Sequence, residues 1–148
     1  MTLSNDLTGT WELVTRVTRT ASGREVPSPF GDDPVALLMY DGRGNFSAQF
    51  MKRDRQPEDE QIAPTASAGA NNSRPVGGYD AYFGRYTVDD AQGTVTQTLI
   101  GSLSPENVGQ TLTRAMSVSG DELTITVDTT SDGEAAVITL RWRRAPHL

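Results

Sequence analysis

The feature that most constrains the fold is an alternation of apolar and polar residues with a period of two. In the segment 110–118, Leu112, Met116 and Val118 share one face with Arg114. Successive side chains of a strand point to opposite faces, so this period predicts strands rather than helices. Glycine supplies the positive φ that tight turns need. Tight turns are therefore predicted at the glycine-containing segments 41–44, 89–93 and 119–122.

The alternation predicts eight strands, and short links join most of them. The predicted strands are 9–17, 35–40, 45–52, 81–88, 94–103, 110–118, 123–127 and 138–142. In the first of these, Trp11, Leu13, Thr15 and Val17 are expected on one face. Eight consecutive strands favour an all-β fold, an antiparallel up-and-down barrel, over a two-sheet sandwich. A barrel of eight strands closes around a space for side chains or one small ligand.

One link is long. Residues 54–78, between the third and fourth predicted strands, are rich in Pro, Ala, Ser, Asn and Gly. A connection of this length inside a compact domain is unusual, so we expect a flexible loop or a lid. The 148 residues are about the length of one domain. We therefore expect residues 1–148 to form a single barrel domain.

Composition removes several classes of function. The chain has no cysteine and one histidine, His147 near the C-terminus, so thiol, Ser-His and zinc chemistry are not expected. The net charge of −6 argues against a nucleic-acid partner. No run of about 20 apolar residues and no secretory signal is present, so we expect a cytoplasmic protein without membrane contact. We expect no metal and no cofactor.

A series of motifs along the chain resembles one family. It begins with Gly9-Thr10-Trp11 and continues through residues 38–47, 79–86, 104–109, 120–124 and 142–144. In this order the motifs resemble the bacterial and fungal lipocalin-like domain family. The resemblance implies a calycin-type barrel, and in related barrels this fold implies binding of hydrophobic ligands. The resemblance implies that an arginine of the last strand, Arg141, Arg143 or Arg144, crosses the Trp11 ring. Many members have histidines where this chain has Gln97 and Thr98, so a role based on histidine is not expected.

Arg114 is the most informative candidate residue, because strand alternation places it inside the barrel. A buried guanidinium must be paired, hydrogen-bonded or facing a wet cavity. We hypothesise a polar cluster of Arg114, Gln97 and tyrosine hydroxyls that orients a carbonyl, enolate or carboxylate of a ligand. The alternatives are a structural network or a shift of register that turns Arg114 outward. The predicted ligand-binding residues are Arg114, Gln97, Tyr40, Tyr82, Tyr86, Phe46, Phe50, Leu99, Met116 and Trp142.

Three functions fit these observations. The first is binding of a small apolar or amphipathic organic molecule inside the barrel. The second is a cofactor-free cyclase or isomerase of secondary metabolism, acting on a polyketide-like or terpenoid-like substrate, with Arg114, Tyr82 and Tyr86 as candidate catalytic residues. The third is a non-catalytic interaction domain whose barrel is filled with side chains.

Overall fold

The computed structural model describes residues 2–57, 59 and 76–147. Nine strands and two short helices are assigned within these residues. The strands are β1 (Gly9–Thr20), β2 (Glu25–Val26), β3 (Val35–Tyr40), β4 (Asn45–Met51), β5 (Tyr79–Asp89), β6 (Thr94–Ser102), β7 (Thr111–Ser119), β8 (Glu122–Ser131) and β9 (Glu134–Arg144). The helices are α1 (Leu3–Asp6) and the 3₁₀ turn η2 (Pro105–Asn107).

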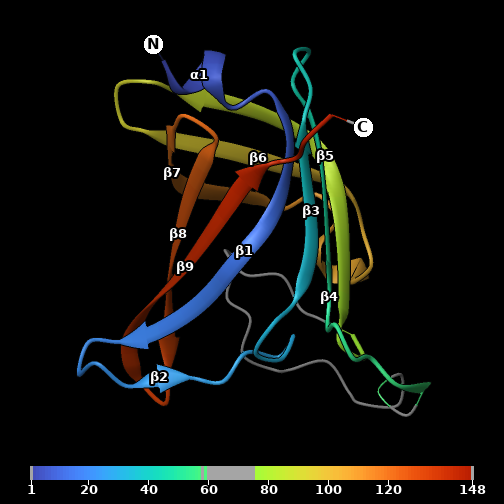
Figure 1. Cartoon of the computed structure of the whole chain (residues 1–148), viewed down its shortest axis with the longest axis vertical. Helices are drawn as coiled ribbons and strands as arrows, with labels where there is room; N and C mark the ends of the chain where they lie inside the picture. Colours follow the sequence, from blue (N-terminus) through green and yellow to red (C-terminus); the bar gives the residue numbers. More distant parts are fainter. Residues whose placement is uncertain (1, 58, 60–75, 148) are drawn as a thin grey trace.

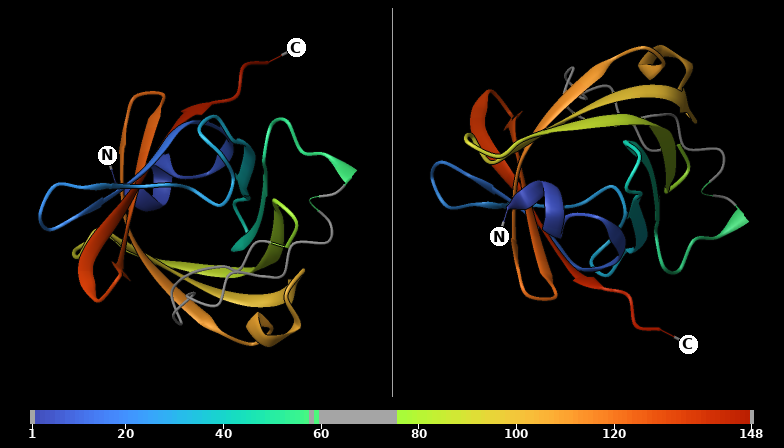
Figure 2. Two further views of the ribbon diagram at one scale, coloured as in Figure 1. Left: turned by 90° about the horizontal axis from the view of Figure 1, so that it is seen from below. Right: turned by 90° about the horizontal axis from the view of Figure 1, so that it is seen from above.

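Eight of the strands form a closed antiparallel barrel. Each strand from β3 to β9 pairs with the next one along the chain, and β1 pairs with both β3 and β9. The views from below and above show these strands arranged in a ring (Figure 2). β2 is an additional strand that pairs with the end of β1 outside this ring of pairings. The predicted eight-stranded up-and-down barrel is therefore confirmed, whereas the predicted loop or lid at 54–78 lies largely outside the described residues.

The regular strands turn alternate side chains into the barrel, as their sequence predicts. In β7, Leu112, Arg114 and Met116 are buried while the residues between them are exposed. β3 alternates in the same way, with Ala36, Leu38 and Tyr40 inside. The prediction that Arg114 faces the interior is thus confirmed.

A β-bulge makes β1 differ from its predicted pattern. The register of β1 against β9 shifts between Leu13 and Thr15, and Val14 is 51% exposed. A bulge adds one residue to a strand and reverses the parity that follows it. Beyond this point Thr18 and Thr20 are buried and Arg16 faces the interior. The expectation that Thr15 and Val17 share the inner face with Trp11 was wrong.

One end of the barrel is closed by the N-terminal segment (Figure 1). α1 lies against β5 and β7, and the backbone N–H and Oγ of Ser4 donate to the Asp90 carboxylate at 2.9 and 2.7 Å. Beneath it, the fully buried Trp11 donates from Nε1 to the Leu7 carbonyl at 2.9 Å. The Arg144 guanidinium lies 4.2 Å from the Trp11 ring centroid, which identifies the arginine expected from the family resemblance. No helix within the described residues is long and apolar enough to cross a membrane.

Candidate ligand-binding site

The barrel encloses a cavity of about 500 Å³ that opens at the end opposite α1. Its mouth is formed by the segment that follows β2 and by the turn between β8 and β9, both near the lower end of the molecule in Figure 1. Pockets that hold small organic molecules have volumes of roughly 300–1,000 Å³. The cavity therefore has the size needed for one such molecule.

Most of the inner wall is apolar. Its aliphatic and thioether side chains are Val26, Leu38, Met116, Ile125, Val127, Ile138 and Leu140. Aromatic rings cover a second part of the wall, where Phe50 lies 5.7 Å from Trp142, 6.3 Å from Tyr82 and 5.6 Å from Phe30, between ring centroids. A wall of this kind favours the transfer of apolar groups from water.

Arg114 places a cation in this apolar wall. The residue is only 7% exposed, and its Nη1 atom has no hydrogen-bond partner within the part of the chain that the structure describes. Burial lowers the pKa of the guanidinium, an effect that Tyr82 and Tyr40 oppose. Arginine stays protonated in proteins, so the group remains a cation with a donor to offer.

Gln97 and Tyr40 also line the cavity, and they bond to each other. The Gln97 amide nitrogen donates to the Tyr40 hydroxyl at 2.6 Å, and that hydroxyl lies 3.8 Å from the Met116 sulfur. Burial raises the pKa of Tyr40 well above its usual value, so its hydroxyl is neutral at ordinary pH. Of the predicted polar cluster, the structure thus links two members directly and places Arg114 on the same cavity.

Arg16 is a second cation on the cavity, and the sequence pattern did not predict it. Its Nη1 donates to the Ser28 hydroxyl at 3.1 Å, and its guanidinium carbon lies 5.6 Å from the centroid of the Phe30 ring. Ser28 belongs to the segment beside the mouth, so Arg16 lies nearer the opening. Burial lowers the pKa of Arg16, and Tyr82 opposes this effect. The sequence signal that could have identified the bulge is the pair of adjacent apolar residues, Leu13 and Val14, which breaks the alternation.

The other predicted site residues divide into two groups. Those that line the cavity are Arg114, Gln97, Tyr40, Tyr82, Phe50, Met116 and Trp142. The remaining three do not appear in the described lining. Phe46 packs against Tyr40 and Tyr82, and Leu99 is buried in the core. The hydroxyl of Tyr86 donates to the Asp41 carbonyl.

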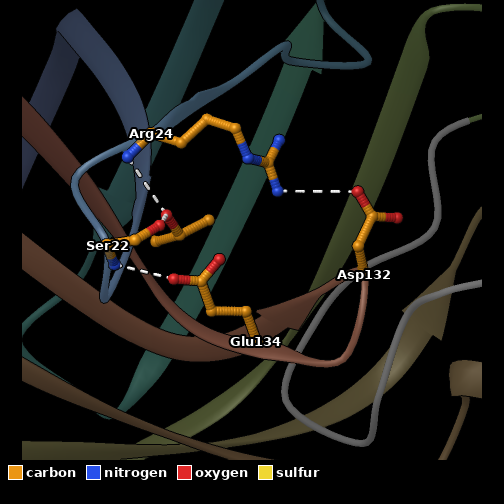
Figure 3. Close-up of polar contacts among 5 residues, drawn as sticks. Ser22, Arg24, Asp132 and Glu134 are labelled. Carbon is orange, nitrogen blue, oxygen red and sulfur yellow. Dashed lines mark hydrogen bonds and ion pairs between the residues drawn. The ribbon is translucent and has the colours of Figure 1, made fainter.

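A set of polar contacts fixes the mouth on the β1–β2 side (Figure 3). The Ser22 backbone N–H donates to the Glu134 carboxylate at 2.7 Å, and Arg24 Nη2 lies 3.5 Å from Asp132 Oδ2. Asp132 and Gly133 both have positive φ (51° and 78°), as a tight two-residue hairpin turn requires. These contacts tie the β1–β2 turn to the β8–β9 turn beside the opening.

This tie is expected to weaken in acid. Hydrogen bonds from Ser22 lower the pKa of Glu134 in the folded protein. A carboxylate with a lowered pKa stabilises the fold above its unfolded pKa, and that stabilisation disappears as the pH falls through the folded pKa. Glu134→Gln should therefore lower the thermal midpoint at pH 7 and lower it by less near pH 3. Thermal unfolding at both pH values measures this, and an equal difference at the two would contradict it.

A closed eight-stranded barrel with a mostly apolar cavity defines a calycin-type binding fold. A family model described as a lipocalin-like domain matches residues 8–145, so the chain belongs to the lipocalin-like domain family. The resemblance of the sequence motifs is thereby confirmed. A search of curated proteins found no match. This fold suggests ligand binding in general, without indicating the kind of ligand.

Proposed function

We propose that this protein binds one small, mostly apolar organic molecule inside the barrel. The observation that carries the proposal is the cavity of about 500 Å³, open at one end and lined mainly by aliphatic and aromatic side chains. A barrel filled with side chains, the third function considered above, is disfavoured by a space of this size. Access from the mouth fits this proposal, because the fully buried side chains of Trp11 and Leu7 lie at the opposite end, beside α1.

A neutral dye tests this proposal directly. N-phenyl-1-naphthylamine is apolar, uncharged and fluorescent in apolar surroundings. We expect it to bind with a stoichiometry of one and with increased fluorescence. Energy transfer from Trp142, which lies on the cavity wall, should report the same event.

Filling the cavity should abolish binding of the dye. Ile138 faces the cavity from β9, and the next residue back along the strand, Val137, faces outward and is 40% exposed. We expect Ile138→Trp to weaken dye binding by about tenfold or more, because excess volume in an apolar pocket is poorly tolerated. Val137→Trp adds a similar bulk to the same strand and should leave the affinity within about twofold of wild type.

Two results would contradict the proposal that the dye binds inside the barrel. Equal loss of affinity in both variants would mean that the dye does not occupy the cavity. Absence of dye binding to the wild-type protein, at concentrations up to the solubility of the dye, would remove the proposal itself.

A further inference from the structure

The wall of the cavity carries two cations although the protein as a whole is acidic. Arg114 and Arg16 both line it, whereas the net charge of the chain is −6. Among the described residues of the lining, the one carboxylate is Asp132, which is at the mouth and pairs with Arg24. The charge of the cavity is therefore opposite to that of the surface, and its cations face the interior without an acidic partner from the described wall.

Arg144 shows how this chain satisfies an arginine that has a structural role. Its Nη1 and Nη2 donate to the carbonyls of Thr8 and Asp6, both at 3.0 Å, and its Nε lies 3.4 Å from the Asp121 carboxylate. The Arg114 guanidinium is more deeply buried, yet its Nη1 finds no partner among the described residues. Burying an uncompensated guanidinium is energetically costly, so the stability of the fold does not explain why an arginine lies on the cavity wall.

The neighbouring polar groups do not neutralise Arg114. Tyr40 stays protonated because burial raises its pKa, and its hydroxyl already accepts from Gln97. Trp142 contributes a second buried donor on the same wall, since its Nε1 also has no partner among the residues described. Arg114 Nη1 and Trp142 Nε1 are thus two buried donors that lack an acceptor among the described residues, and a buried donor normally requires one.

We propose that the ligand is an organic acid with a single carboxylate on an apolar body. This inference rests on the binding function proposed above and specifies its ligand class. The carboxylate accepts hydrogen bonds from the Arg114 guanidinium, and the body of the ligand lies against the apolar wall between Arg114 and the mouth. Arginine suits a carboxylate because its planar group of donors matches the two oxygens.

A single negative charge fits this cavity better than a phosphate dianion. The inward neighbours of Arg114 along β7 are Leu112 and Met116, both buried and apolar, and such surroundings do not solvate a second charge. Arg16 is already engaged with Ser28 and the Phe30 ring near the mouth. One buried guanidinium is therefore matched by one buried carboxylate.

Matched pairs of an acid and its primary amide test the ligand class. The pairs are decanoic acid with decanamide and biphenyl-4-carboxylic acid with its amide, each used to displace N-phenyl-1-naphthylamine at pH 7.5. We expect each acid to bind about tenfold or more tightly than its amide, as a charge-assisted hydrogen bond provides. Equal affinities, or a preference for the amides, would overturn the inference about the ligand class. The proposed binding function would still stand in that case, because it rests on binding of the dye. Failure of the dye itself to bind would overturn both.

Substitution at position 114 locates the carboxylate. Arg114→Met should reduce the acid preference to within about threefold and leave amide binding unchanged, because methionine keeps the apolar reach without the charge. Arg141→Met makes the same change on the exposed face of β9, where the side chain is 62% exposed, and should keep the full preference. If Arg114→Met retains the wild-type preference, the assignment of the carboxylate to Arg114 is wrong.

A second variant covers a failure of Arg114→Met to fold. Arg114→Lys keeps one charge but loses the planar pair of donors. It should therefore bind the acids more tightly than their amides, with a smaller ratio than the wild-type protein. A ratio equal to or above that of wild type would contradict the proposed pairing.

Discussion

Replacing Gly84 with alanine is expected to destabilise the barrel by about 3 kcal/mol or more. A Cβ atom at this position would lie 1.9 Å from the Thr98 carbonyl oxygen and 3.0 Å from the Ile100 nitrogen. Both of these are backbone atoms, so no change of rotamer relieves the overlap. The strands themselves would have to separate, which breaks the pairing of β5 with β6.

The close approach at Gly84 arises from an irregularity between these strands. Gly84 is opposite Leu99 and Phe83 is opposite Gly101, so Ile100 is the additional residue of a bulge. A bulge bends its strand and increases the local twist, and a barrel needs such bends to close. Glycine at position 84 allows the two backbones to approach at this bend.

Gly42→Ala is the matched control for Gly84→Ala. Nothing lies within 4 Å of a Cβ built on Gly42, and its φ is not positive. We expect its stability to stay within about 0.5 kcal/mol of wild type. Urea unfolding followed by circular dichroism compares the two variants. A Gly84→Ala protein as stable as Gly42→Ala would show that β5 and β6 can separate at this point at little cost.

The sequence was a good guide wherever a strand is regular. The inward position of Arg114 followed from alternation alone, because β7 pairs with β8 without a shift of register. The inward position of Gln97 was also predicted correctly, because the bulge in β6 comes after this residue. The contact between Trp11 and an arginine of the last strand followed from the family resemblance, and the structure identifies that arginine as Arg144 among the three that were considered.

The errors in β1 follow from its bulge. The bulge at Val14 reverses the parity of the residues beyond it in the strand, so Thr15 and Val17 do not share the inner face with Trp11, and Arg16 lies on the cavity instead. The bulge depends on how the closed barrel bends β1 between β3 and β9, which is a property of the whole sheet. Its local sign in the sequence is the break in alternation at Leu13 and Val14. The size of the cavity could not be predicted from the sequence, because it depends on the packing of inward side chains from all eight strands.

The stability of two methionine variants should distinguish a structural arginine from one kept for a ligand. We expect Arg114→Met to raise the free energy of unfolding by about 1–3 kcal/mol, because the change removes a buried charge and keeps the apolar volume. Arg144→Met should lower it by about 1–3 kcal/mol, because the bonds to Thr8 and Asp6 and the stacking on Trp11 are lost.

Both variants are measured by urea unfolding without ligand and then with decanoic acid. A ligand that binds only the folded state raises its apparent stability, so the acid should stabilise the wild-type protein more than Arg114→Met. The buried charge would then lower the free energy of unfolding of the empty barrel, and binding of the acid would offset this destabilisation. A clear destabilisation of unliganded Arg114→Met would instead mean that the guanidinium supports the fold, and the case for an acid-binding residue at this position would fail.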